Sequence, residues 1–172
     1  MLKKCFALLF SLLIVTFTTT AMAAKPDKTD MSAFKDIDRS ALIKCAFEVQ
    51  PKSYAPYSNF NVAAAVLCSS GKIYTGVNVE NASYPAGICA ERNAIFHAAA
   101  EGERQIKAIV IIGGPKGVVT DYCSPCGVCR QVMREFGNPK KVLVIMAKSP
   151  TDYKEMTLEE LLPLSFGPES LG

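Results

Sequence analysis

The sequence has no tryptophan and a single histidine, His97, among its 172 residues. With histidine so scarce, any metal site must take most of its ligands from cysteine, aspartate or glutamate. The sequence also lacks a large excess of positive or negative charge. The formal net charge is only +3, and no stripe of lysine and arginine marks a nucleic-acid groove. We therefore expect no nucleic-acid partner.

The one long hydrophobic run lies at the N-terminus. Lysines at positions 3 and 4 precede an apolar stretch over residues 5–17, and an Ala-Met-Ala site occupies residues 21–23. A short positive region, an apolar core and small residues at a cleavage site predict a signal peptide over residues 1–23 rather than a transmembrane helix. Export to a periplasmic or extracellular location is the expectation, with no stable membrane association once the leader is removed.

Two other interpretations of the leader stay open. The apolar stretch is also compatible with a retained membrane anchor. Alternatively, translation begins at Met31 and the protein is cytosolic. On the signal-peptide interpretation, residues 24–37 form a polar spacer and the folded domain spans residues 38–172. A domain of that length buries a core without disulfides.

Apolar periodicity in the remaining chain alternates between helical and strand patterns. Asp38 is a suitable N-cap for the first helix, and Gly102 and Gly137 end the next two. The predicted order is helix 38–49, strand 62–68, strand 73–79, helix 89–100, strand 108–112, helix 126–136, strand 142–147 and a short helical segment at 158–162. Such alternation indicates a layered α/β domain with a mixed sheet.

Three cysteines stand where helices are predicted to begin. Cys126 and Cys129 form a Pro-Cys-x-x-Cys turn, and Cys89 opens a separate helix. The turn places two sulfurs on one side of a first helical turn, and helix N-termini stabilise thiolates. Three protein ligands leave a fourth position open for water, which is the arrangement of catalytic rather than structural zinc. One zinc ion per chain is predicted.

The residues beside these cysteines add chemistry. Glu91 lies in the first turn after Cys89, within reach of a water molecule at the fourth position, and a carboxylate there can relay a proton. Arg92 and Arg130 each follow a key residue directly, and one or both are expected to offset the thiolate charge.

Other interpretations of the cysteines compete with zinc. Cys126 and Cys129 alone are compatible with a disulfide, particularly in an exported protein. Cys123 makes a second Cys-x-x-Cys pair with Cys126. Cys45 and Cys68 lie in apolar segments and are expected in the core. His97 falls in mid-helix and is not expected to be a ligand.

Four segments of the chain resemble one family. They are YAPYSNFNVAAAV, TGVNVENASYPAGICAERNA, SPCGVCRQVMREF and MTLEELLPLSFGP. Together they resemble the small homotetrameric zinc-dependent cytidine deaminases, over about residues 41–171. The resemblance implies a three-layer α/β/α sandwich with a mixed five-stranded sheet, and zinc-dependent hydrolysis of cytidine and deoxycytidine to uridine and deoxyuridine in pyrimidine salvage.

The resemblance also implies roles for individual residues. It implies zinc on Cys89, Cys126 and Cys129, Glu91 as the proton shuttle and Arg92 as the compensating charge. For the substrate it implies Phe60 against the pyrimidine, Asn78 and Glu80 on the ribose, the Ala90 backbone on the base, and Phe166 reaching the site of a neighbouring subunit in a homotetramer.

Independent physical reasoning supports part of this substrate site. Residues i and i+2 of a strand share a face, so Asn78 and Glu80 are expected to point together into a pocket. A carboxylate beside an amide suits sugar hydroxyl groups. Ala63 departs from the family, which usually has glycine there, and the added methyl is expected to crowd the strand near Phe60.

Three alternative functions remain at this point. A deaminase of another small aminopyrimidine would keep the zinc motif but not the Asn78/Glu80 pair. A polynucleotide deaminase would need a basic channel. A non-catalytic zinc-stabilised module would need no glutamate beside the ligand Cys89. For Phe166, the alternative to a shared site is that it caps the core of its own chain.

Overall fold

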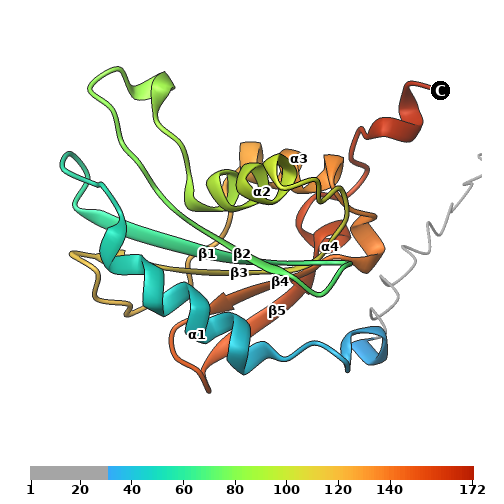
Figure 1. Cartoon of the computed structure of the whole chain (residues 1–172), viewed down its shortest axis with the longest axis horizontal. Coiled ribbons are helices and arrows are strands. Elements are labelled where there is room, and N and C mark those ends of the chain that lie inside the picture. The colour runs from blue at the N-terminus through green and yellow to red at the C-terminus, as the bar shows by residue number, and fades with distance from the viewer. Residues whose placement is uncertain (1–30) are drawn as a thin grey trace, which may run out of the picture.

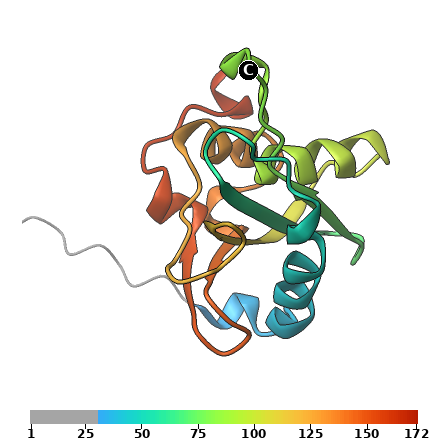
Figure 2. The ribbon, with the colours of Figure 1, turned by 90° about the vertical axis from the view of Figure 1, so that its left-hand side faces the viewer.

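The computed structural model describes residues 31–172. These residues form three layers, with one β-sheet between two layers of helices (Figure 1). The leader predicted over residues 1–23 lies outside the described residues. Helix α1 covers one face of the sheet, and α2 and α3 cover the other, as the turned view also shows (Figure 2). The elements are α1 (Arg39–Val49), β1 (Phe60–Cys68), β2 (Ile73–Val77), α2 (Ala90–Ala100), β3 (Ile106–Pro115), α3 (Gly127–Glu135), β4 (Leu143–Ala147), β5 (Tyr153–Thr157) and α4 (Leu158–Leu161).

The sheet has five strands in the order β2-β1-β3-β4-β5. Strand β1 pairs antiparallel with both β2 and β3, and β4 pairs antiparallel with β5. The β3–β4 pair is parallel, with α3 in the connection between the two strands. The predicted three-layer α/β/α architecture with a mixed five-stranded sheet is therefore confirmed.

Strand β1 is apolar at nearly every position because helices cover both faces of the sheet. Ala64 and Val66 pack in a cluster with residues of α2 and α3. Ala63 and Ala65 point the other way, into a cluster with residues of α1. The methyl group of Ala63 therefore lies on the α1 side of the sheet. The structure contradicts the expectation that it crowds Phe60.

The packed part of the domain begins before the predicted boundary at residue 38. Phe34 is 3% exposed and Ile37 is 6% exposed, and both belong to the cluster on the α1 side. Residues 31–37 thus include core contacts, although their composition reads as part of a spacer. Asp38 caps α1 as predicted, its side chain accepting a hydrogen bond from the backbone N of Ala41 at 3.0 Å.

Several features of the sheet differ from the sequence pattern. Strand β1 begins at Phe60 rather than at residue 62, and β3 spans Ile106–Pro115 rather than 108–112. The predicted strand over 73–79 ends at Val77, and strand β5 carries no clear apolar pattern in the sequence. β5 is an edge strand with only Thr157 fully buried, so its polar composition hides it. Within residues 31–172, no helix has the length and apolar character needed to cross a membrane.

Candidate active site

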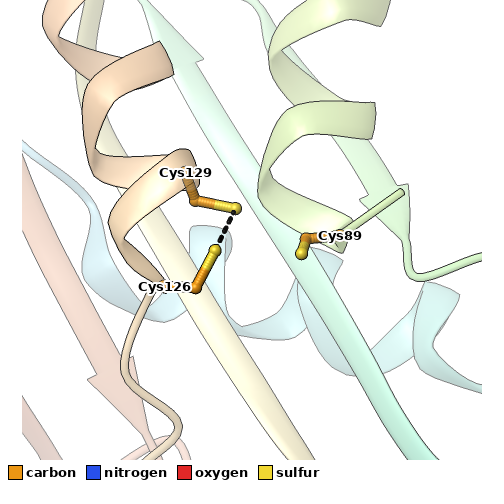
Figure 3. A group of neighbouring side chains, drawn as sticks. All are labelled: Cys89, Cys126 and Cys129. Carbon is orange, nitrogen blue, oxygen red and sulfur yellow. Dashed lines mark hydrogen bonds between the residues drawn. The ribbon is translucent and has the colours of Figure 1, made fainter. Parts of the chain in front are cut away.

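Two helices begin side by side at one end of the sheet, and each begins at a cysteine. Cys89 is the N-cap of α2 and Cys126 is the N-cap of α3, with extended backbones that turn into the helices. Cys129 lies one turn into α3 and faces Cys126 and Cys89 (Figure 3). The helices bring together three cysteines from two distant parts of the chain, as the motif predicts.

The sulfurs of these three residues lie within 4.8 Å of one another. The sulfurs of Cys126 and Cys129 are 3.5 Å apart. Tetrahedral zinc with Zn–S bonds of about 2.3 Å holds its sulfurs about 3.8 Å apart, so the group fits a zinc ion. A disulfide would bring two sulfurs to about 2.05 Å, and the six cysteines of residues 31–172 are all free thiols.

The surroundings favour a thiolate at Cys89. Its pKa is lowered to about 5, first by a hydrogen bond from the thiol of Cys129 and then by Arg92, although burial acts in the opposite direction. The Arg92 Nη2 lies 3.8 Å from the sulfur of Cys89. The buried Nε of Arg92 has no hydrogen-bond partner. That Arg92 offsets the thiolate charge stays a prediction, and its guanidinium lies against the cysteine group.

The other arginine does not. Arg130 donates to the carbonyl oxygens of Pro125 at 2.8 Å and Leu161 at 2.9 Å. Its guanidinium ties the start of α3 to the end of α4, so of the two arginines it is Arg92 that contacts a cysteine sulfur.

Cys123 does not join the three-cysteine group. It lines the adjacent pocket, and burial, followed by the charges of Glu91 and Cys89, raises the pKa of its thiol to about 11. Cys123 is therefore a neutral thiol beside the site. Its position favours the Cys126–Cys129 pair over the Cys123–Cys126 pair.

Glu91 is 4% exposed in the first turn of α2. Burial is the largest influence on its pKa and raises it. The side chain nevertheless lines the same pocket as Cys89 and Cys126. A buried carboxyl group beside a candidate metal group is well placed to exchange a proton with a bound molecule.

The pocket has a volume of about 600 Å³. Its walls come from the start of β1, the segment after β2 and the starts of α2 and α3. Four residues that the sequence assigns to the substrate line it: Phe60, Asn78, Glu80 and Ala90.

Asn78 and Glu80 do not sit on a strand, which corrects the basis of their prediction. Because β2 ends at Val77, both belong to the segment that leaves the sheet. The Asn78 amide bonds the backbone of β1, accepting from Val62 N at 2.8 Å and donating to the carbonyl of Phe60 at 2.9 Å. Glu80 Oε2 accepts from the backbone N atoms of Tyr57 at 2.9 Å and Ser58 at 3.2 Å.

Sequence reasoning missed several lining residues. Tyr57 and Tyr84 pack edge-to-face at the pocket rim with ring centroids 6.1 Å apart. Both are largely exposed. Two tyrosines in Pro-containing loops carry no periodic signal, and only the resemblance of their segments marked them.

Phe166 is absent from the pocket of its own chain. It is 59% exposed, and its carbonyl accepts a hydrogen bond from Gln131 Nε2 at 3.1 Å. The structure therefore contradicts the alternative in which Phe166 caps the core of its own chain.

Comparison with known proteins places this site in a family. Residues 37–146 match the model of the cytidine and deoxycytidylate deaminase zinc-binding region. Cytidine deaminase from Halalkalibacterium halodurans is 42% identical over 135 residues, which cover 78% of this chain and 98% of that protein. A probable cytidine deaminase from Dictyostelium discoideum is 42% identical over 138 residues, covering 78% and 90%.

The chain belongs to the cytidine deaminase family. Solved members of the family share its fold. The cytidine deaminase of Burkholderia pseudomallei is 42% identical, with a TM-score of 0.69 over 76% of this chain and 100% of that one. The enzyme from Mycobacterium tuberculosis is 35% identical, with a TM-score of 0.66 over 77% and 99%. The family is zinc-dependent, and the three-cysteine group supplies the ligands that zinc requires.

Proposed function

We propose that this chain hydrolyses cytidine and deoxycytidine to uridine and deoxyuridine, releasing ammonia, as a step in pyrimidine salvage. One observation carries the proposal. The buried carboxyl of Glu91 and the three-cysteine group meet in a pocket whose other wall presents an aromatic ring, Phe60, and a carboxylate, Glu80. A non-catalytic zinc module has no use for a buried glutamate at that position.

Different residues of the chain carry out different parts of the reaction. Cys89, Cys126 and Cys129 would hold zinc, which would supply the acidification of a water molecule. Glu91 would take one proton from the water and deliver it to ring nitrogen 3 as the water oxygen bonds to carbon 4. It would then carry the second proton, from the added hydroxyl, to the amino group as the bond between carbon 4 and that nitrogen breaks and ammonia leaves. Its burial keeps bulk water from competing for the proton. Arg92 offsets the charge of three thiolates, which would otherwise reduce the acidity of the water.

The opposite wall selects a nucleoside. Phe60 packs against the pyrimidine, the Ala90 backbone contacts the base edge, and Asn78 and Glu80 bind sugar hydroxyl groups. One oxygen of Glu80 already accepts two backbone N–H groups. The Ser58 side chain also hydrogen-bonds this carboxylate, and the remaining lone pairs can accept from a sugar hydroxyl.

The pocket also argues against phosphorylated substrates. Arg92 is the only lysine or arginine among its lining residues in the described part of the chain, and it faces Cys89. CMP and dCMP would therefore bring a phosphate into the pocket without a cation to meet it. Free cytosine would lose the sugar contacts.

Absorbance-monitored turnover by purified protein of measured zinc content tests the proposal. Cytidine and deoxycytidine should react far faster than CMP, dCMP or cytosine. Efficient turnover of a nucleotide would show that the pocket has been misassigned. Turnover of a different aminopyrimidine in preference to cytidine would replace the substrate, and no turnover by the zinc-loaded protein would leave a binding module.

We further propose that the enzyme is a homotetramer in which Phe166 completes the pocket of a neighbour. Its support is the exposed side chain and a tail that is fixed in place. Gln131 and Arg134 of α3 hold the tail, the latter through hydrogen bonds to Ser165 and Glu169. An exposed aromatic ring on an anchored tail suits an intermolecular contact.

Subunit mixing tests the shared site. Phe166→Ala subunits lack the donated ring, and Glu91→Gln subunits lack the shuttle. Mixed assemblies should contain interfaces with both groups intact and recover the wild-type affinity for cytidine. Light scattering gives the oligomeric state of each sample. A monomer with full activity in dilute solution contradicts a shared site.

We also propose that the leader directs export and that the mature chain begins near Ala24. N-terminal sequencing of native protein decides the point. A first residue at Met31 would support a cytosolic enzyme, and an intact residue 1 would support a retained anchor.

A further inference from the structure

The hydrogen-bond ladder between β1 and β2 stops before β1 does. The final paired residues are Ala63 and Val77. The backbone N of Asn78 still donates to the carbonyl of Val62 at 3.1 Å, but the carbonyl of Asn78 turns away and accepts from Tyr54 N at 3.0 Å. The N–H of Val62 and the C=O of Phe60, which face that side, therefore lack a backbone partner from β2.

The side chain of Asn78 fills this gap. Its Oδ1 accepts from Val62 N at 2.8 Å and its Nδ2 donates to the carbonyl of Phe60 at 2.9 Å. A carboxamide offers the same acceptor and donor as a peptide group, so the ladder continues through a side chain. Both polar groups of the Phe60 backbone then have partners, because its N–H donates to Ser58 Oγ at 3.0 Å.

Phe60 needs this support. It is the first residue of β1, where strand ends fray, and it is 38% exposed and lines the pocket. Its backbone also follows Asn59, which has a φ of 53°, a conformation that few non-glycine residues adopt. Pairing with β3 holds the other edge of β1 here, with Lys116 N donating to the carbonyl of Asn59 at 2.7 Å. On the β2 edge, the Asn78 amide is the partner that holds the Phe60 carbonyl.

We infer that Asn78 is a positioning residue for Phe60, holding the ring against the base through the β1 backbone whether or not the amide also touches the sugar. The inference rests on the proposed function and deepens it. A contact with the sugar alone would matter only for substrates that carry the matching hydroxyl groups. A positioning role matters for every pyrimidine nucleoside that packs on Phe60.

A substrate series separates the two roles. Cytidine carries the 2′ and 3′ hydroxyl groups, and 2′,3′-dideoxycytidine lacks both. For Asn78→Ala, kcat/KM should fall roughly five- to fifteenfold on dideoxycytidine as well as on cytidine, the scale of one or two lost hydrogen bonds. Asn78→Asp keeps an acceptor for Val62 N–H but loses the donor to the Phe60 carbonyl, so it should show a similar loss on dideoxycytidine.

A double-mutant cycle then asks whether the effect passes through the ring. In a Phe60→Ala background, Asn78→Ala should change kcat/KM for dideoxycytidine less than twofold, because there is no ring to position. A general loss of folding would lower activity and zinc content in both backgrounds. Amide hydrogen exchange gives a readout without substrate: the Val62 amide should exchange faster in Asn78→Ala than in wild type.

The outcomes are distinct. Normal turnover of dideoxycytidine by Asn78→Ala, with a loss on cytidine alone, overturns the inference and leaves a pure sugar contact. An equal loss in the Phe60→Ala background also overturns it. If wild type fails to deaminate cytidine, the proposed function fails. Exchange at Val62 still decides, because an unchanged rate in Asn78→Ala shows that the amide does not hold β1.

Discussion

Gly76 permits the close packing of α2 on the sheet. A methyl group at this position should displace α2 and so disturb the active-site residues that α2 carries. The residue lies in β2, opposite Ala64 of β1. A Cβ atom at position 76 would lie 2.3 Å from the backbone N of Ala94 and 2.6 Å from the carbonyl oxygen of Ala90. These are backbone atoms of α2, so no flexible side chain can move aside.

The size of the effect follows from this distance. Ordinary contact begins at 3.4 Å, so α2 must move by about 3.4 − 2.3 = 1.1 Å to accept the methyl group. The first turn of α2 carries Glu91, two residues after Cys89. A misplacement of about 1 Å costs on the order of a hundredfold in rate, and overpacking destabilises by about 1–3 kcal/mol.

Gly76→Ala should therefore lower kcat for cytidine by roughly a hundredfold and the free energy of unfolding by about 1–3 kcal/mol. Steady-state kinetics and urea denaturation measure the two quantities. Gly127→Ala is the matched control, because a Cβ at the start of α3 meets nothing within 4 Å. It should keep its stability and zinc. Wild-type kinetics and stability in Gly76→Ala would refute the reasoning that the position of α2 on β2 sets the site.

Four further substitutions test individual residues. Cys129→Ser should abolish zinc binding and activity, whereas Cys123→Ser should keep its zinc; elemental analysis showing a zinc-free Cys123→Ser would mean that the wrong pair was chosen. Glu91→Gln should keep zinc and fold but lose about a hundredfold to ten-thousandfold in kcat, and near-normal turnover would exclude the shuttle. Ala63→Gly should destabilise by about 1 kcal/mol without changing KM for cytidine, since its methyl lies on the α1 side; a shifted KM would contradict that placement.

The sequence predicts the metal group well because its signal is local. Each cysteine precedes or occupies the first turn of a helix, and those helix starts are marked by apolar periodicity in the residues that follow. What spacing cannot give is the distance between the two helix starts. That both begin at the same end of the sheet follows from the directions in which β1, β2 and β3 pair, which a pattern of apolar residues does not encode.

The sequence pattern does not predict a residue's role correctly where that role depends on the residue at which a strand ends. Asn78 continues the alternating pattern of β2, yet the chain leaves β1 at that residue, because Tyr54 and Ile88 supply other backbone partners for residues 78 and 79. Asn78 and Glu80 were expected to share a pocket because residues i and i+2 of a strand share a face. Both do line the pocket, although neither lies in β2. Strand β5 was hidden for a related reason, since Lys154 and Glu155 interrupt any apolar run at a sheet edge.

The topology explains why the pocket draws on segments so far apart in sequence. Strand β1 begins at this end of the sheet, and its antiparallel neighbours β2 and β3 therefore both end there. Each of those strand ends leads into a loop and then into a helix, α2 or α3, that starts at the same end. One end of the sheet thus brings together the start of a strand with an aromatic ring, the end of a strand followed by an amide and a carboxylate, and two helix N-termini with thiols. Because the helix starts sit on the rigid sheet while the linking loops line the mouth, substitutions in the loops should alter which pyrimidine is accepted, and substitutions under the helices should alter the rate.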